Sequence, residues 1–301
     1  MERSYILHMF TPGKQMSPFD INMAVDAGYQ VVVPYCGVSL DEITGLTQDA
    51  IFSRGPKGVK ATGIFIGGRD VLLAADMLER ARKAMVPPFE VSVIADPSGS
   101  YTTAAALVAC VEQQLRKVHD TDFAGKRVLI LGGTGTVGRI AGVLAARLGA
   151  KVALASHRDQ ANAERAAAET AARFDCTLGG VSTASEATRQ AALAEAEVVL
   201  ATAAAGVQVM SAADRACAGA LLVAADVNAV PPEGIAGVGV MDSGKALDGS
   251  RAVGIGALAV GNVKYQVENG LLVAMRNADK PLYLGFAEAF DKAREILAAK
   301  G

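Results

Sequence analysis

Tryptophan is absent from the chain, aromatic residues make up only 5%, and cysteine and histidine are scarce. The cysteines are Cys36, Cys110, Cys176 and Cys217, and no two of them form a CxxC pair. This spacing argues against a disulfide scaffold, and it predicts free thiols in a reducing compartment. The three histidines have no metal-ligand spacing, so the sequence predicts no metal site.

Long apolar runs and blocks of charge are missing as well. No stretch approaches the roughly 18 apolar residues that a membrane-spanning helix needs. Residues 1–8 lack the apolar length and the cleavage pattern of a signal peptide. The net charge of −2 comes with no basic stripe and no acidic tail. We therefore expect a cytoplasmic protein with no membrane or nucleic-acid partner.

Apolar residues are abundant instead. They make up 51% of the 301 residues, and the mean hydropathy is +0.29. A chain of this length suggests about two domains with sizeable cores. Strand-like and helix-like patterns alternate from end to end, which predicts a two-lobed α/β fold with parallel sheets.

The predicted elements can be read from these patterns. Strands are predicted at residues 5–10, 30–34, 61–66, 91–95, 127–131, 151–155, 197–201 and 221–225. Helices are predicted at residues 18–27, 41–52, 70–85, 102–118, from the glycine-rich turn described below to 148, and at 161–174, 256–269 and 281–300.

The most specific motif is a GxGxxG turn at residues 133–138, which directly follows the apolar strand 127–131. A strand, this turn, a helix and a second strand in that order are typical of a dinucleotide-binding Rossmann unit. We expect Gly133 to allow a sharp turn, Gly135 to let a pyrophosphate approach the backbone, and Gly138 to bring helix and strand together. The helix N-terminus offers unpaired N–H groups to the phosphates. The residues expected to contact the dinucleotide are Gly133, Thr134, Gly135, Thr136, Val137 and Gly138.

The end of the second strand predicts which dinucleotide is used. An acidic residue there selects NAD, whereas arginine or small polar residues accommodate the 2′-phosphate of NADP. Ser156, His157 and Arg158 occupy this place, about 20 residues after Gly133. The first carboxylate, Asp159, comes later and leaves NAD possible. We predict NADP as the preferred cofactor; the alternative for Arg158 is a solvated loop residue.

A polar connector at residues 119–125 precedes the fingerprint strand and suggests a domain boundary. We predict an N-terminal α/β substrate domain at residues 1–122, completed by the C-terminal helix at 281–301. Residues 123–280 are predicted to form the Rossmann domain, a doubly wound parallel sheet.

Polar residues also gather where the strand 91–95 ends and a helix begins. In an open parallel sheet this carboxyl edge is where ligands bind. The alternative is ordinary helix capping by Ser98 or Ser100. The candidate substrate-side residues are Asp96, Ser98, Gly99, Ser100, Thr102 and Thr103.

Two further strand ends lie within the predicted Rossmann domain. Asp226 and Asn228 follow the buried strand 221–225, and Ala203 follows the strand 197–201. We expect these three residues near the cofactor. Asx-turn chemistry before Pro231 is an equal alternative for Asp226 and Asn228.

The sequence as a whole resembles the bacterial methylene-tetrahydromethanopterin dehydrogenases of one-carbon metabolism, relatives of an NADP-dependent methylene-tetrahydrofolate dehydrogenase. The methanopterin branch is favoured by Met16-Ser-Pro-Phe-Asp20 and by Val227-Asn-Ala-Val-Pro231. The matching segments are residues 16–24, 46–54, 62–68, 87–89, 95–103, 226–232 and 254–266.

The resemblance implies a homo-oligomer that oxidises N5,N10-methylene-tetrahydromethanopterin to the methenyl form with NADP or NAD. It also implies an N-terminal pterin domain beside the Rossmann domain. The family's pterin-side lysine corresponds to Lys264, and its acidic residues correspond to Asp20 and Asp96. These three residues are the candidate catalytic residues.

Two alternatives remain beside this function. Methylene-tetrahydrofolate would serve as substrate in a folate enzyme, and a non-catalytic NADP sensor would bind the dinucleotide without turnover. Bifunctional folate enzymes carry a Tyr-x-x-x-Lys motif, and no tyrosine here has lysine four positions on. We therefore expect no strong cyclohydrolase activity.

The first prediction concerns Lys264. If this lysine orients the pterin, Lys264→Ala should lower turnover at least as much as it weakens binding. Steady-state kinetics with the natural pterin measure both effects. Unchanged kinetics would remove Lys264 from the site.

Overall fold

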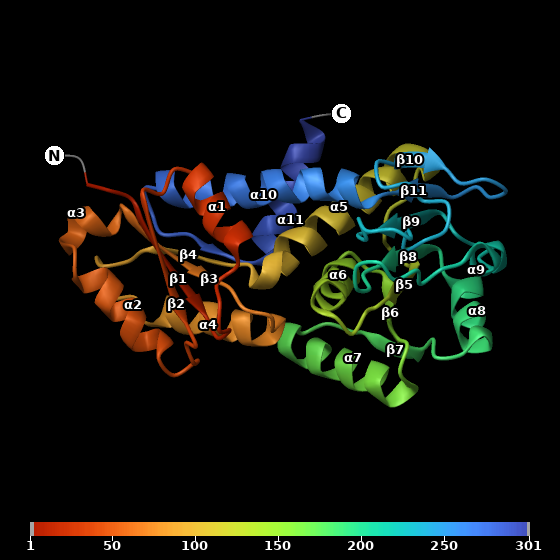
Figure 1. Cartoon of the computed structure of the whole chain (residues 1–301), viewed down its shortest axis with the longest axis horizontal. Coiled ribbons are helices and arrows are strands. Elements are labelled where there is room, and N and C mark those ends of the chain that lie inside the picture. Colours follow the sequence, from red (N-terminus) through yellow and green to blue (C-terminus); the bar gives the residue numbers. More distant parts are fainter. Residues whose placement is uncertain (1–2, 300–301) are drawn as a thin grey trace. The chain divides into compact units, whose positions relative to one another are not determined.

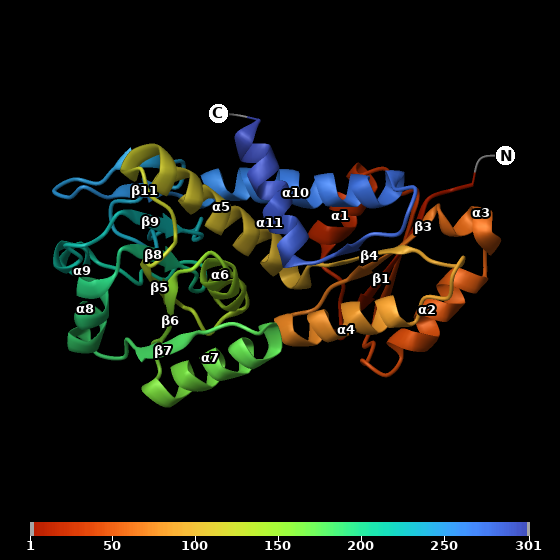
Figure 2. The same cartoon turned by 180° about the vertical axis from the view of Figure 1, so that it is seen from behind.

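The computed structural model describes residues 3–299, which form two compact units, each built on its own sheet (Figures 1 and 2). The first unit comprises the chain up to Thr102 together with Tyr265–Lys292. The second comprises Thr103–Lys264 and the residues from Ala293 onward. The predicted α/β fold with parallel sheets is confirmed.

The sheet of the first unit is entirely parallel, with the strand order β12-β4-β3-β1-β2. Its central strands are fully buried, as expected when helices cover both faces of a parallel sheet. All its strands therefore end at one edge. The strands are β1 (Ile6–Thr11), β2 (Val31–Cys36), β3 (Thr62–Ile66), β4 (Ser92–Ala95) and β12 (Tyr283–Leu284).

Helices cover the first sheet from both sides. Helix α2 (Ile43–Phe52) packs beside α4 (Val71–Lys83) on one face, and the short α3 (Gly55–Val59) precedes β3. Helix α1 (Pro18–Asp26) and the second half of α10 (Ala257–Asn277) lie on the other face (Figure 1). The guanidinium of Arg276 on α10 donates to the carbonyl that ends α1, Ala27 O, at 2.8 Å.

The sheet of the second unit has the order β10-β11-β9-β8-β5-β6-β7. Counted from β5, six parallel strands are arranged 3-2-1-4-5-6, the dinucleotide-binding Rossmann order, and β10 adds an antiparallel edge. The strands are β5 (Arg127–Leu131), β6 (Lys151–Ser156), β7 (Gly179–Ser182), β8 (Val198–Ala201), β9 (Val223–Asp226), β10 (Ser243–Ala246) and β11 (Val253–Ile255).

The helices of this unit lie on opposite faces of its sheet (Figure 1), as expected for the right-handed connections that parallel strands favour. Helices α6 (Thr136–Arg147) and α7 (Gln160–Phe174) lie on one face (Figure 1). Helices α8 (Glu186–Glu195) and α9 (Ala212–Cys217) lie on the other face. Helices α5 (Ser100–His119) and α11 (Phe286–Ala298) contribute residues to both units. Glu112 on α5 is buried and receives two hydrogen bonds from the guanidinium of Arg294 on α11, at 2.6 and 2.7 Å.

Several elements differ from the sequence predictions. Strands β7, β10, β11 and β12 and helices α3, α8 and α9 were not predicted. The predicted helix at 256–269 continues to Asn277, because Leu271, Leu272 and Met275 are buried. The predicted helix at 281–300 begins only at Phe286, since residues 283–284 pair with β4; residue 300 lies outside the described residues.

Within residues 3–299, no helix combines the length and the apolar character needed to cross a membrane.

His8 is a half-buried histidine on β1. Its Nδ1 lies 3.1 Å from the hydroxyl of Tyr35 on β2. Burial, reinforced by the positive charge of Arg54, holds the pKa of His8 below its usual value. The folded state therefore binds this proton more weakly than the unfolded state does.

This lowered pKa predicts a pH-dependent stability. The contribution of His8 is complete above about pH 6.5, the ordinary histidine pKa, and declines as the pH falls toward the lowered folded pKa. His8→Gln removes the titrating group and keeps a hydrogen-bonding side chain beside Tyr35. Urea unfolding near neutral pH and about one unit below pH 6.5 should show a smaller loss of stability in the variant than in the wild type. An equal loss in both would contradict the assignment.

Candidate functional site

The glycine-rich turn sits where β5 leaves the second sheet and α6 begins. Gly132 has φ +73°, so its left-handed backbone supplies the sharp turn that we predicted for Gly133. Gly133 instead lies against the neighbouring strand: a Cβ there would be 2.6 Å from Ile130 O and 2.9 Å from the Cα of Leu154 on β6. The prediction of a sharp turn at Gly133 is wrong, because the sharp turn and the close approach to β6 need two different glycines.

The other glycines of the motif are equally constrained. A Cβ on Gly138 would be 2.7 Å from the Cα of Gly133 and 2.7 Å from the hydroxyl of Thr202. Gly138 thus brings α6 against the turn, as predicted. A Cβ on Gly135 would meet only Gly132 O, at 3.3 Å, a tight contact that a shift of a few tenths of an ångström would relieve; the rest of the space beside this residue is open.

The N-terminus of α6 presents unpaired donors. Its N-cap is Gly135, and no side chain in the described part of the chain caps the helix. The first helical hydrogen bond runs from Arg139 N–H to Gly135 O. The N–H groups of Thr136, Val137 and Gly138 therefore have no carbonyl partner within the helix, and they fit the pyrophosphate of a dinucleotide.

The end of β6 differs in detail from the sequence prediction. Ser156 is buried, and its hydroxyl accepts from Arg158 N–H at 3.1 Å and bonds Asn162 Oδ1 at 3.0 Å. The Asp159 carboxylate accepts from Asn162 N–H at 2.7 Å and caps α7. The side chains of His157 and Arg158 are exposed. Ser156 and Asp159 thus shape the turn, and His157 and Arg158 are presented to solvent.

Asp226 and Asn228 hold the loops beyond β8 and β9. The buried carboxylate of Asp226 accepts from the N–H groups of Asn228 (2.9 Å), Gly234 (2.7 Å) and Ile235 (3.4 Å). Burial raises the pKa of Asp226, and these hydrogen bonds only partly oppose it. Their geometry favours the Asx-turn alternative for this residue.

Asn228 is committed to backbone in the same way. Its Oδ1 accepts from the N–H groups of Gly206 (2.9 Å) and Val230 (3.0 Å), and its Nδ2 donates to Pro232 O at 2.7 Å. It therefore ties the segment after β8 to the segment after β9. Ala203 lies at the start of the segment after β8. A Cβ at Gly132 would be 2.7 Å from the backbone of Ala203.

In the first unit, Asp96 organises the start of α5. Its buried carboxylate accepts from Tyr101 N–H (2.8 Å), Thr102 N–H (3.2 Å) and the Thr102 hydroxyl (2.6 Å). The Asp96 carboxylate thus caps the helix, and the alternative of capping by Ser98 or Ser100 is wrong.

The neighbouring residues form a tight loop at the carboxyl edge of the sheet. Ser98 has φ +52°, is exposed, and donates its hydroxyl to Gly68 O at 2.8 Å, which joins the ends of β3 and β4. Gly99 also has a positive φ, +66°. The Ser100 hydroxyl is buried and has no partner among the described residues. Thr103 is half-buried.

Asp20 and Lys264 lie on different helices. Asp20 is buried in the first turn of α1, which follows β1 at the same carboxyl edge as Asp96, and its N–H donates to the Ser17 hydroxyl at 3.4 Å. Lys264 is half-buried on α10. It is the last residue of the segment Thr103–Lys264 of the second unit, and Tyr265 begins a segment of the first unit. Sequence reasoning missed Glu268, which is fully buried on α10. The sequence signal for Glu268 was its spacing from Lys264, because residues four positions apart lie on one face of a helix.

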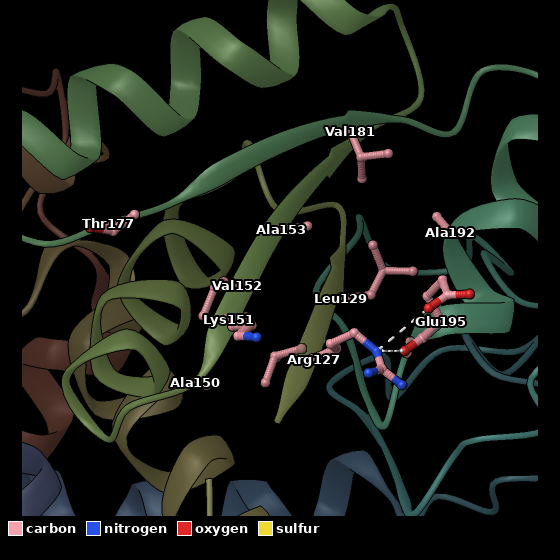
Figure 3. A pocket seen from close by; sticks show the side chains of 12 residues that line it. Arg127, Leu129, Ala150, Lys151, Val152, Ala153, Thr177, Val181, Ala192 and Glu195 are labelled. Atoms are coloured by element: carbon pink, nitrogen blue, oxygen red, sulfur yellow. Dashed lines mark hydrogen bonds and ion pairs between the residues drawn. The ribbon is translucent and has the colours of Figure 1, made fainter. Parts of the chain in front are cut away.

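A cavity of about 510 Å³ lies elsewhere in the second unit (Figure 3). Leu129, Ala153, Val181 and Ala192 line it, and Arg127 and Glu195 pair at its edge. Arg127 and Lys151 begin β5 and β6. This hollow therefore reaches the amino ends of the strands, away from the glycine-rich turn.

Known proteins resemble the chain over most of its length. A family model described as methylene-tetrahydromethanopterin dehydrogenase, N-terminal, matches residues 18–98. An NAD(P)-dependent methylenetetrahydromethanopterin dehydrogenase of Methylorubrum extorquens is 48% identical over 296 residues, which cover 98% of this chain and 99% of that protein. The bifunctional protein MdtA of the same organism is 32% identical and covers 97% of this chain and 98% of its own.

Among solved structures, ornithine carbamoyltransferase from Pyrococcus furiosus aligns with a TM-score of 0.50 at 14% identity. The alignment covers 92% of this chain and 86% of that one, and it concerns the fold alone.

The space beside Gly135 predicts a variant that separates binding from folding. Gly135→Ala adds a methyl group that stands where the pyrophosphate approaches and that the fold accommodates once Gly132 O shifts by a few tenths of an ångström. We expect NADP and NAD binding to weaken about tenfold or more, a loss of about 1.4 kcal/mol or more, with little change in thermal stability. Calorimetric titration measures the affinities.

Gly45→Ala is the matched control, because a Cβ at Gly45 meets nothing within 4 Å. It should leave dinucleotide affinity unchanged. Full affinity in Gly135→Ala would show that the phosphates bind elsewhere.

Proposed function

The chain belongs to the family of NAD(P)-dependent methylenetetrahydromethanopterin dehydrogenases, and we infer from this how its residues share the reaction. The chain is an oxidoreductase that transfers a hydride from N5,N10-methylene-tetrahydromethanopterin to NAD(P) and gives the methenyl form. The observation that carries the assignment of the cofactor site is the uncapped N-terminus of α6 above a turn of closely packed glycines.

The dinucleotide fits this turn. The N–H groups of Thr136, Val137 and Gly138 would hold the pyrophosphate, while Thr134 and Gly135 form the approach to it. Bound there, the nicotinamide ring supplies the hydride acceptor. Asp226 and Asn228 act through the loops that they hold, and Ala203 lies on one of those loops. The proposed dinucleotide domain, residues 123–280, is built on the second unit, although residues 265–280 belong to the first compact unit.

NADP is the proposed preferred cofactor. The exposed guanidinium of Arg158 supports this preference, because guanidinium groups make charge-assisted hydrogen bonds to phosphates, and its sequence neighbour His157 is exposed as well. Asp159, which would favour NAD, is already engaged with the N-terminus of α7. Ser156 contributes by fixing the backbone of Arg158.

The pterin is assigned to the carboxyl edge of the first sheet. The loop of Ser98, Gly99 and Ser100 lies there, with the buried Ser100 hydroxyl available for a hydrogen bond. Thr102 is bound to Asp96, so it supports the loop, and Thr103 completes the first turn of α5. The proposed pterin domain spans residues 1–122 and is completed by 281–301.

The reaction asks little of acid–base groups. Lone pairs on the two nitrogens beside the methylene carbon expel the hydride and leave a delocalised cation. Carboxylates such as Asp20 or Asp96 near this cation would stabilise it. Because no proton needs to be accepted, the proposed role of Lys264 is to orient the pterin.

The proposal also includes the location and the oligomeric state of the protein. The four free cysteines support a cytoplasmic location, because free thiols are typical of a reducing compartment. The family resemblance supports a homo-oligomer.

The assay that tests this function uses purified protein with methylene-tetrahydromethanopterin, once with NADP and once with NAD. We expect reduced nicotinamide and methenyl product to appear together, faster with NADP, and no strong hydrolysis of the methenyl product. Methylene-tetrahydrofolate in a parallel run tests the folate alternative. Dinucleotide binding without turnover on either pterin would favour the sensor instead.

A further inference from the structure

Arg139 is a charged residue next to the glycine-rich turn that neither the motif nor the proposed catalysis accounts for. Its Nε donates to Thr134 O at 3.1 Å. Its Nη1 donates to Glu169 Oε2 at 3.0 Å and to the Thr170 hydroxyl at 3.3 Å. Its side chain is only 19% exposed. The guanidinium thus joins the turn to two adjacent residues of α7.

The contact to Thr134 completes the fixation of one peptide group. The N–H of Gly135 donates to Gly132 O at 3.0 Å, and the carbonyl of the same peptide group, Thr134 O, accepts from Arg139. Both ends of the peptide unit that precedes α6 are therefore held. Arg139 also donates its own N–H to Gly135 O at 3.0 Å. Two successive carbonyl oxygens at the phosphate-facing helix end are thus bound by one residue.

The anchor on α7 is firm. Thr170 is fully buried, and its hydroxyl donates to Ala166 O at 2.7 Å, which leaves its oxygen to accept from Arg139. The Glu169 side chain is 47% exposed and neutralises the guanidinium. This arrangement directs the donors of Arg139 toward the turn and α7.

The turn itself needs such an anchor. Packing against β6 and the loop after β8 holds Gly132 and Gly133, but a Cβ on Gly135 would meet only Gly132 O. Without Arg139, the peptide group between Thr134 and Gly135 would be held through its N–H alone, and ordering it on binding would cost free energy. We propose that Arg139 is a positioning residue for the dinucleotide, which pre-orders the turn by fixing the peptide group between Thr134 and Gly135. The inference rests on the proposed cofactor site and adds to it a residue outside the GxGxxG motif.

A direct attraction between the guanidinium and the phosphates is the competing explanation, and substitutions separate the two. Arg139→Lys keeps the charge, but a single ammonium nitrogen cannot occupy both places taken by Nε and Nη1. Positioning predicts that Arg139→Lys weakens dinucleotide binding nearly as much as Arg139→Met, about tenfold for each, as expected for one charge-assisted hydrogen bond. Direct attraction predicts that Arg139→Lys binds as the wild type does.

Glu169→Gln gives results of opposite sign. Positioning predicts weaker binding, by about threefold, since the guanidinium loses part of its anchor. Direct attraction predicts tighter binding, because a negative charge near the phosphates has been removed. Arg165→Gln, on the exposed side of the same helix, is the control for lost positive charge and should bind as the wild type does.

The experiment titrates NADP and NAD into each variant by calorimetry without pterin, and it records melting temperature and pterin KM. We expect both dinucleotides to weaken by the same factor, with melting temperature and pterin KM near wild type. Wild-type affinity in Arg139→Lys, or tighter binding in Glu169→Gln, would overturn the proposal. So would parallel losses in pterin KM and melting temperature, which would indicate general loosening. If Arg139→Met does not fold, the other two variants decide. Because binding is measured without turnover, failure here is distinct from failure of the proposed reaction.

Discussion

The close approach of β6 and of the loop after β8 to the glycine-rich turn is the constraint on which the proposed cofactor site depends. A methyl group at Gly132 would be 2.7 Å from the backbone of Ala203, and one at Gly133 would be 2.9 Å from the backbone of Leu154. The turn is therefore fixed between β6 and the loop after β8. Gly138 then fixes α6 against the turn, so the uncapped helix end faces outward at the carboxyl edge of the sheet.

Most polar side chains near the two sheet edges serve the backbone. Asp96, Asp159, Asp226 and Asn228 each accept hydrogen bonds from main-chain N–H groups, and three of these four residues are buried. Buried carboxylates and amides need such partners, and the loops need such anchors. We propose that ligands are met instead by backbone N–H groups at the start of α6, by cations such as Arg158 and Lys264, and by the Ser100 hydroxyl. Recognition and scaffolding are thus divided between neighbouring residues.

Local patterns in the sequence were sufficient for the elements with long apolar runs and for the fingerprint unit. The sequence predicts β5 at residues 127–131, α6 after the glycines and β6 at residues 151–155. Each of these elements is encoded by residues that are neighbours in the sequence. β7 and β12 could not be predicted, since Gly179–Ser182 and Tyr283–Leu284 become strands only through pairing with β6 and β4. The same limit applies to side chains. Ser156 has the residue type of a phosphate ligand, but its bond to Asn162 is visible only in three dimensions. The role of Arg139 could not be predicted from a sequence motif, because its partners Glu169 and Thr170 lie on another helix.

The central claim is that the end of α6 holds the pyrophosphate of the cofactor. A crystal structure of the protein with NADP tests it most directly. The account predicts pyrophosphate oxygens about 3 Å from the N–H groups of Thr136 and Val137, a hydrogen-bond distance, with the Thr134 carbonyl still bound to Arg139. Phosphates bound instead at Arg127 and Lys151, at the amino ends of the strands, would contradict it.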